Sequence, residues 1–234
     1  MQSGRGPWRW ASTAAILLAL GLAGPVVAQA QQAPAASSAT RVNLMPQNDT
    51  QAEPDSAKTL NLNASRWSIG AYAGVLSGSA FYETLTNIRY RSSYLAAVDL
   101  TYSAFKFDSL PLSIDIDATV AKRFGEDSQW DFGIIPMVRW KYFPWNDYVY
   151  TNLRVGLIGI SYVTGISPWE RHWSGNGQGS RFLNYLAVEV DVAPKADSPS
   201  EFFVRVDHRS GAWGLINGTY GGSTYVTLGW RRHL

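Results

Sequence analysis

The feature that most constrains the fold of this chain is a period-two alternation of apolar and polar residues, repeated in eight short segments. In the segment 110–120, for example, Leu112 and Ile114 alternate with Ser113 and Asp115. Successive side chains of a β-strand point to opposite faces, so each segment predicts a strand with one apolar and one polar face. The predicted strands are 67–76, 94–105, 110–120, 130–142, 148–161, 182–193, 202–210 and 223–234.

The charged residues within these segments share the face opposite the aliphatic residues, and both signs of charge occur there. They are Asp99, Asp115, Asp117, Arg139, Arg154, Glu189, Asp191, Arg205 and Asp207. Alternation alone also fits a soluble sandwich, but a mixed-charge inner face is typical of a membrane barrel with a polar lumen. The fold class predicted is therefore all-β, an eight-stranded antiparallel transmembrane β-barrel. Its interior side chains should largely fill the lumen, which excludes a wide pore.

The N-terminal part of the chain predicts export. Arg5 and Arg9 precede a short apolar stretch, and Ala28-Gln29-Ala30 gives a small-x-small cleavage site. We therefore expect a signal peptide at 1–30, a flexible periplasmic leader at 31–64 that is poor in large apolar residues, and the barrel at 65–234. The localisation expected is the outer membrane of a Gram-negative bacterium.

Composition excludes several other classes of function. The chain has no cysteine, which rules out disulfides and cysteine-based metal sites, and its 3 histidines offer no plausible zinc cluster. We expect no metal and no cofactor. The 20 basic and 18 acidic residues become balanced once Arg5 and Arg9 are removed, so no nucleic-acid partner is expected. The sequence leaves the oligomeric state open.

The connections between the predicted strands suggest an orientation. With a periplasmic N-terminus, the outer loops are 77–93, 121–129, 162–181 and 211–222, and the inner turns are 106–109, 143–147 and 194–201. The outer set is longer, which is the asymmetry typical of such barrels.

Candidate chemistry lies at the end of the seventh strand. His208 and Ser210 continue the lipid-facing parity of Phe202, Val204 and Val206, at the end predicted to reach the outer leaflet. Placing polar groups on a lipid-facing surface costs free energy, so such residues suggest a function. Residues two apart on a strand project side by side, so these two side chains could act as general base and nucleophile on an ester.

Around these residues the sequence resembles a known family. A Phe-x-x-x-x-x-His-x-Ser stretch from Phe202 to Ser210, followed by a loop rich in glycine and asparagine and one last strand, looks like the PagL-type lipid A 3-O-deacylases. The resemblance implies an outward-facing His208 as base, Ser210 as nucleophile, and lipid A in lipopolysaccharide as the partner and substrate. The resemblance is specific only over about 202–234.

Two positions depart from the family pattern. The asparagine that usually follows the serine is Gly211, and the position closest to the family's acid is Gly222. Centring the turn between the sixth and seventh strands near 195–198 places Asn184 opposite Ser210. We hypothesise that Asn184, together with Gly211, stabilises the oxyanion.

Loop residues complete the candidate site. Glu170, in the third outer loop, is the candidate acid for His208, and its neighbour His172 is a second possibility. Arg209 could contact a lipid A phosphate or point into the lumen mouth.

Three functions remain open on the sequence. The first is an acyl-ester hydrolase acting on lipid A. The second is a catalytically inactive barrel of the same fold, with a structural or lipid-binding role in the outer membrane. The third is an adhesin-like or transport-associated barrel that uses the loops at 77–93 and 162–181.

Overall fold

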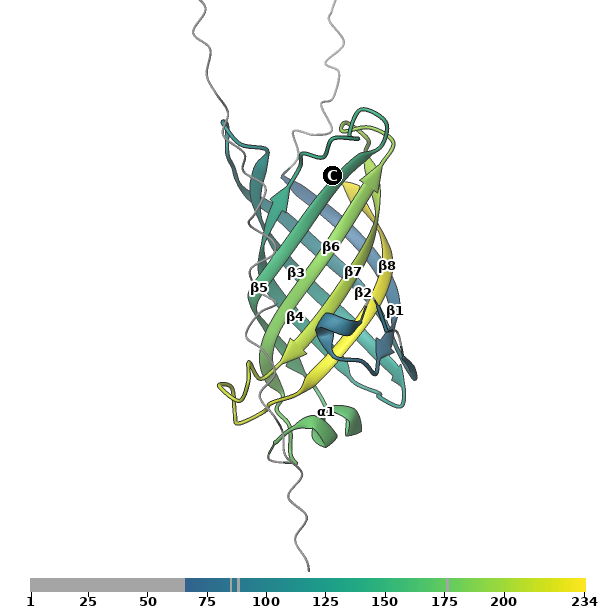
Figure 1. The fold of residues 1–234 in the computed structure, drawn as a ribbon, viewed down its shortest axis with the longest axis vertical. Coiled ribbons are helices and arrows are strands. Elements are labelled where there is room, and N and C mark those ends of the chain that lie inside the picture. The colour runs from purple at the N-terminus through teal and green to yellow at the C-terminus, as the bar shows by residue number, and fades with distance from the viewer. Residues whose placement is uncertain (1–65, 85, 88, 176) are drawn as a thin grey trace, which may run out of the picture. The chain divides into compact units, whose positions relative to one another are not determined.

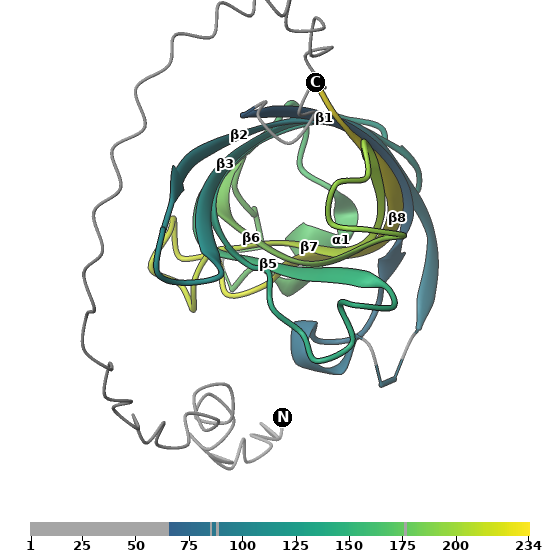
Figure 2. The same cartoon turned by 90° about the horizontal axis from the view of Figure 1, so that it is seen from above.

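The computed structural model describes residues 66–234, except 85, 88 and 176. These residues form one closed antiparallel barrel in which each strand pairs with its neighbours in sequence and β1 pairs with β8. Figure 2, a view along the barrel, shows the ring that they make. The strands are β1 (Trp67–Ser77), β2 (Tyr90–Lys106), β3 (Leu112–Gly125), β4 (Trp130–Trp140), β5 (Tyr150–Val163), β6 (Phe182–Ala193), β7 (Ser200–Ser210) and β8 (Gly222–His233). All eight predicted strands are confirmed. The predicted signal peptide and almost the whole leader lie outside the described residues.

The barrel is apolar outside and polar inside. Large apolar side chains such as Val98, Val138 and Leu228 are exposed on the outer face, whereas the charged residues predicted for the lumen are buried. This arrangement suits a bilayer, where backbone groups are satisfied by strand closure and apolar side chains meet lipid. No helix within the described residues is long and apolar enough to cross a membrane. The chain is thus an integral outer-membrane barrel, as predicted.

Ion pairs fill the lumen. The carboxylate of Glu189 lies 2.5 Å from Arg154, 2.6 Å from Arg205 and 2.7 Å from Arg231. Asp117 adds a second link between Arg154 and Arg205, at 3.1 and 2.9 Å. Removing one partner of such a cluster leaves an uncompensated buried charge, which costs about 3–5 kcal/mol. The lumen of the described barrel thus holds a polar core of buried ion pairs.

Pro136, which has no N–H for a strand ladder, is accommodated in β4 by a local irregularity. The register of β4 with β5 shifts between Ile134 and Val138, and β5 shifts between Gly156 and Gly159. Proline in a sheet is tolerated at bulges. At this bulge the adjacent residues Leu157 and Ile158 are both exposed on the outer face. The outward-facing apolar residues of β5 therefore have odd numbers before the bulge and even numbers after it.

The two ends of the barrel differ. One end carries the connections 78–89, 126–129, 164–181 and 211–221, which hold the short 3-10 helix η2 (Phe81–Glu83) and the helix α1 (Pro168–Trp173). The other end carries only 107–111, 141–149 and 194–199, together with the C-terminus. Figures 1 and 2 place α1 across the mouth of the first end. We assign that end to the outside, since long loops are extracellular in such barrels.

Candidate active site at the outer end of β7

His208 and Ser210 lie on the outer face of the barrel, at the extracellular end of β7. Phe203, Arg205 and Arg209, which have the other parity, are buried, whereas His208 and Ser210 are partly exposed. In the described part of the chain no hydrogen bond joins the imidazole to the Ser210 hydroxyl. Catalytic contacts are often loose in the absence of substrate, so the two groups remain a candidate pair.

The imidazole of His208 is held by Thr224. Its Nδ1 atom lies 2.8 Å from the Oγ1 atom of Thr224, the residue directly opposite on β8. A hydroxyl can accept the Nδ1 hydrogen, and that tautomer leaves Nε2 free to act as a base. A neutral hydroxyl thus occupies the place beside Nδ1 where a carboxylate would orient a catalytic histidine.

The loop between β1 and β2 covers this pair from outside. The Phe81 ring of η2 lies 4.9 Å from the imidazole of His208, centroid to centroid. Figure 1 shows this segment as the blue coil in front of β7 and β8. Thr224 has the parity of the lipid-facing residues of β8, yet only 4% of it is exposed. The contact between His208 and Thr224 is therefore shielded from the surroundings.

A cavity of about 290 Å³ adjoins His208. Aromatic side chains of three loops form much of its wall, with small residues between them. The aromatic residues are Phe81, Trp169, Trp173 and Tyr220. A mainly apolar wall with a single imidazole and hydroxyls at one side suits a molecule with an alkyl part and a polar reacting group.

Asn184 lies directly opposite Ser210 on β6, the register expected from the sequence. Its side chain is anchored to the bulge of β5: Oδ1 accepts from the Gly159 N–H at 3.3 Å, and Nδ2 donates to the Leu157 carbonyl oxygen at 3.1 Å. An amide nitrogen has two hydrogens, so one remains for a ligand beside Ser210.

Glu170 does not contact His208, which corrects the expectation that it serves as the acid. It is fully buried in the lumen mouth, where its carboxylate accepts from Arg209 at 2.7 Å, Arg123 at 3.1 Å and the Ser223 hydroxyl at 2.8 Å. The reason is electrostatic, because two buried guanidinium groups hold this carboxylate in the lumen. His172, also considered as an acid, is exposed on α1, where it contacts the Trp169 and Trp173 rings.

Arg209 has the lumen parity of β7 and is 2% exposed, so it cannot meet a lipid A phosphate on the outer face. Besides Glu170, its guanidinium donates to the carbonyl oxygens of Ser180 and Arg181 at 3.3 and 3.0 Å. Of the two placements considered for Arg209, the structure has the one at the lumen mouth.

Two glycines at the predicted site allow close packing of backbones. Gly211 follows β7 and approaches the Thr219 carbonyl oxygen so closely that a Cβ would overlap it. A Cβ at Gly222 would overlap the Arg209 carbonyl oxygen. The position that matches the family's acid therefore cannot hold a side chain in this backbone.

Thr224 is the residue of the candidate site that sequence reasoning missed. The signal was present, because the register that pairs Ser210 with Gly222 also pairs His208 with Thr224. The contact with Phe81 had no such signal, since it depends on how the loop after β1 folds.

Comparison with solved structures finds other barrels. The chain is similar to the solved structure of the outer membrane enzyme PagL, with 16% identity and a TM-score of 0.52 over 71% of this chain and 99% of PagL. It is also similar to neisserial surface protein A, with 14% identity and a TM-score of 0.42 over 73% and 98% of the two chains. A third structure is OprG from Pseudomonas aeruginosa, with 11% identity and a TM-score of 0.37 over 73% and 97%.

No protein-family model matches the chain. No curated protein matches it. Sequence identities of 16% and below indicate a shared fold and carry no information on a shared activity. The comparisons and the closed strand order together establish this chain as a protein with the eight-stranded fold of outer-membrane β-barrels.

Proposed function

We propose that this barrel is an outer-membrane acyl-ester hydrolase that acts on lipid A. The observation that carries the proposal is the placement of His208 and Ser210 on the outer face at the extracellular end, with Nδ1 of His208 held by Thr224. Because the extracellular leaflet of a Gram-negative outer membrane presents lipopolysaccharide, a nucleophile there meets an acyl ester without extracting the lipid.

The chemistry proceeds by acyl transfer to Ser210. Nε2 of His208 takes the proton of the Ser210 hydroxyl while Oγ attacks the ester carbonyl carbon. The tetrahedral intermediate collapses, the bond to the sugar oxygen breaks, and His208 returns the proton to that oxygen. Water then attacks the acyl-enzyme by the same route and releases the fatty acid.

The oxyanion of the intermediate lies beside Asn184 in this proposal. The remaining Nδ2 hydrogen of Asn184 and the backbone N–H of Gly211 are the donors. The anchoring of Asn184 to Leu157 and Gly159 supports this role, because a donor fixed before reaction needs no reorganisation during it.

The cavity beside His208 is the proposed place for part of the acylated sugar. Its aromatic and small residues offer a mainly apolar surface beside the imidazole of His208, which suits the acylated part of such a substrate. Thr224 acts as a positioning residue that fixes the tautomer of His208.

One observation favours a second candidate, an inactive barrel with a structural or lipid-binding role. Among the described residues no carboxylate is hydrogen-bonded to His208, so no charge stabilises an imidazolium at close range. The same outer face and cavity would then serve only to hold a lipid.

The deciding experiment is mass spectrometry of lipid A from a Gram-negative host with and without expression of this chain. The hydrolase predicts loss of one acyl chain, abolished by Ser210→Ala. Ser200→Ala is the matched control, since Ser200 lies on the same strand with the same parity at the opposite end. Unchanged lipid A in the presence of folded wild-type barrel would favour the inactive alternative.

A further inference from the structure

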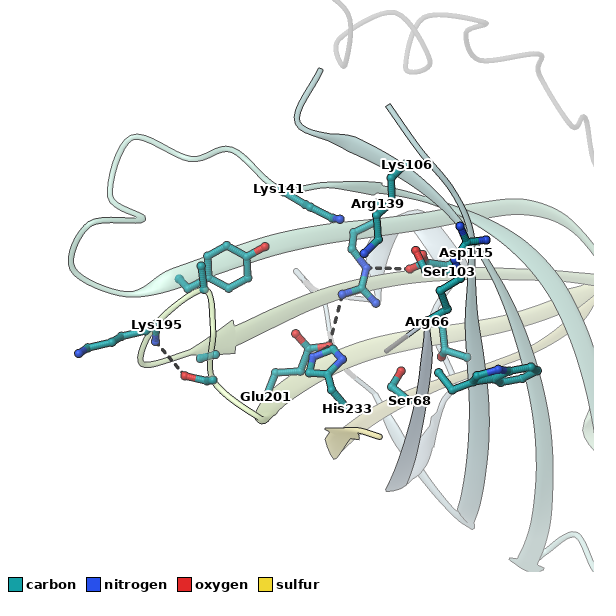
Figure 3. A pocket seen from close by; sticks show the side chains of 16 residues that line it. Arg66, Ser68, Ser103, Lys106, Asp115, Arg139, Lys141, Lys195, Glu201 and His233 are labelled. Carbon is teal, nitrogen blue, oxygen red and sulfur yellow. Dashed lines mark hydrogen bonds and ion pairs between the residues drawn. The ribbon is translucent and has the colours of Figure 1, made fainter. Parts of the chain in front are cut away.

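A second cavity, of about 80 Å³, lies at the end of the barrel opposite His208 and Ser210. It opens at the mouth with the short connections, and Figure 3 shows the side chains that line it. The proposed hydrolysis makes no use of this cavity, because β7 contributes Glu201 here and Ser210 at the other mouth.

Basic groups converge on this cavity from four segments of the chain. Arg66, Lys106, Arg139 and Lys141 line it, and the carboxylates in its wall are Asp115 and Glu201. Arg66 precedes β1 and Lys106 is the last residue of β2. Arg139 lies in β4 and Lys141 directly follows it, so closure of the barrel is needed to bring the four together.

The carboxylates of the wall already have partners. Arg139 binds Asp115 at 2.7 Å and Glu201 at 3.6 Å. Asp115 also contacts Arg154 at 3.4 Å, and Glu201 contacts Arg231 at 3.3 Å. In the described part of the chain neither Lys106 nor Lys141 forms an ion pair, so their charges are left for a ligand.

Lys141 is the informative member of the group. Its side chain is partly buried and points toward Arg139 in Figure 3. Burial and the charge of Arg139 lower the pKa of the Lys141 ammonium and Lys106 adds to this shift, while Asp115 and Glu201 oppose it only in part. Arg139 and Lys106 repel the Lys141 ammonium, and a bound anion would reduce this repulsion.

We propose that this mouth of the barrel is a binding site for a dianionic phosphate group, held by Lys106, Lys141 and Arg66. The excess of basic over acidic groups matches a doubly charged ligand better than a single carboxylate. The hydroxyls of Ser68 and Ser103 also line the cavity and can donate to phosphate oxygens. A water molecule takes up about 30 Å³ in the liquid, so a cavity of about 80 Å³ has room for a phosphate group.

The test is isothermal titration calorimetry of the full barrel in a nonionic detergent with three probes: inorganic phosphate, a soluble short-chain phosphatidic acid, and acetate. Phosphate or phosphatidic acid should bind and acetate should not. Binding of both phosphate and phosphatidic acid identifies a site for the free anion, whereas binding of phosphatidic acid alone identifies a lipid headgroup as the source.

Variants locate the site. Lys106→Gln and Lys141→Gln should each weaken phosphate binding roughly tenfold, the loss expected for one charge-assisted hydrogen bond. Lys195→Gln is the matched control, because Lys195 lines the same mouth but its ammonium points away in Figure 3. Circular dichroism checks that each variant is folded.

Three results would overturn the proposal: no heat of binding with either phosphate probe, equal affinity for acetate and phosphate, or equal losses in Lys195→Gln and Lys141→Gln. None of them bears on hydrolysis at Ser210, which is measured separately on lipid A.

Discussion

The Nδ1 atom of His208 lies 2.8 Å from the Oγ1 atom of Thr224, across the pairing of β7 with β8. Both side chains are on the outer face, and the Phe81 ring packs against the imidazole. The histidine is thus oriented by a hydroxyl and shielded by a loop, an arrangement that makes the catalytic proposal testable residue by residue.

Thr224→Val should reduce ester hydrolysis about fivefold, because the loss of one hydrogen bond to Nδ1 costs about 1 kcal/mol and leaves the tautomer of His208 no longer fixed. Thr224→Ser keeps the hydroxyl and should restore most of the rate. The measurement is the initial rate of fatty-acid release from lipid A. Equal rates in the Val and Ser variants would show that Thr224 only fills space.

Thr224→Asp should raise the rate of hydrolysis roughly tenfold or more, since a carboxylate beside Nδ1 stabilises the imidazolium formed when Ser210 loses its proton. The gain should be in kcat and not in KM. The double variant Thr224→Asp with Ser210→Ala is the control. A rate no higher than wild type in a folded variant would mean that the missing carboxylate does not limit the reaction.

Gly222→Glu, which places an acid at the position closest to that of the PagL-type acid, should instead destabilise the barrel by about 1–3 kcal/mol through overpacking. The physical reason is the overlap of a Cβ with the Arg209 carbonyl oxygen. Urea unfolding followed by tryptophan fluorescence measures the change. A variant as stable as wild type would contradict the packing argument.

Asn184→Ala should lower kcat by roughly 10²–10³, the usual loss for one oxyanion donor, with little change in KM. Because Asn184 also anchors the β5 bulge, unfolding of the variant in urea has to be compared with wild type. Full hydrolysis in Asn184→Ala would remove this residue from the mechanism.

Glu170→Gln should destabilise the barrel by about 3–5 kcal/mol, because it leaves the buried Arg209 and Arg123 guanidinium groups with less compensation. Hydrolysis by the folded fraction should persist. Glu126→Gln is the matched control: its pair with Arg91 is exposed at the same mouth, and its loss should cost about 0–1 kcal/mol. Abolished hydrolysis in a Glu170 variant of normal stability would reinstate it as a candidate acid.

Much of the site could be predicted by counting along strands. The position of a turn fixes the register of an antiparallel pair, so the pairing of Asn184 with Ser210 followed from the hairpin between β6 and β7. Counting in the same way from the pair Ser210 and Gly222 places Thr224 opposite His208. The surroundings of Glu170 could not be predicted in this way, because this residue lies on α1, whose folding over the lumen is not encoded by a strand period. The parity of β7 does place Arg209 on the lumen side.

The sequence alone determined the eight strands, the lumen-facing charges and the outward parity of His208 and Ser210, because a period of two is a local property of extended backbone. Only the tertiary structure decided which groups meet: Glu170 with two lumen arginines, Phe81 with His208, and Lys141 with Lys106 at the far mouth. Those contacts join segments far apart in the chain, and barrel closure and loop packing, which depend on all strands together, bring them within reach.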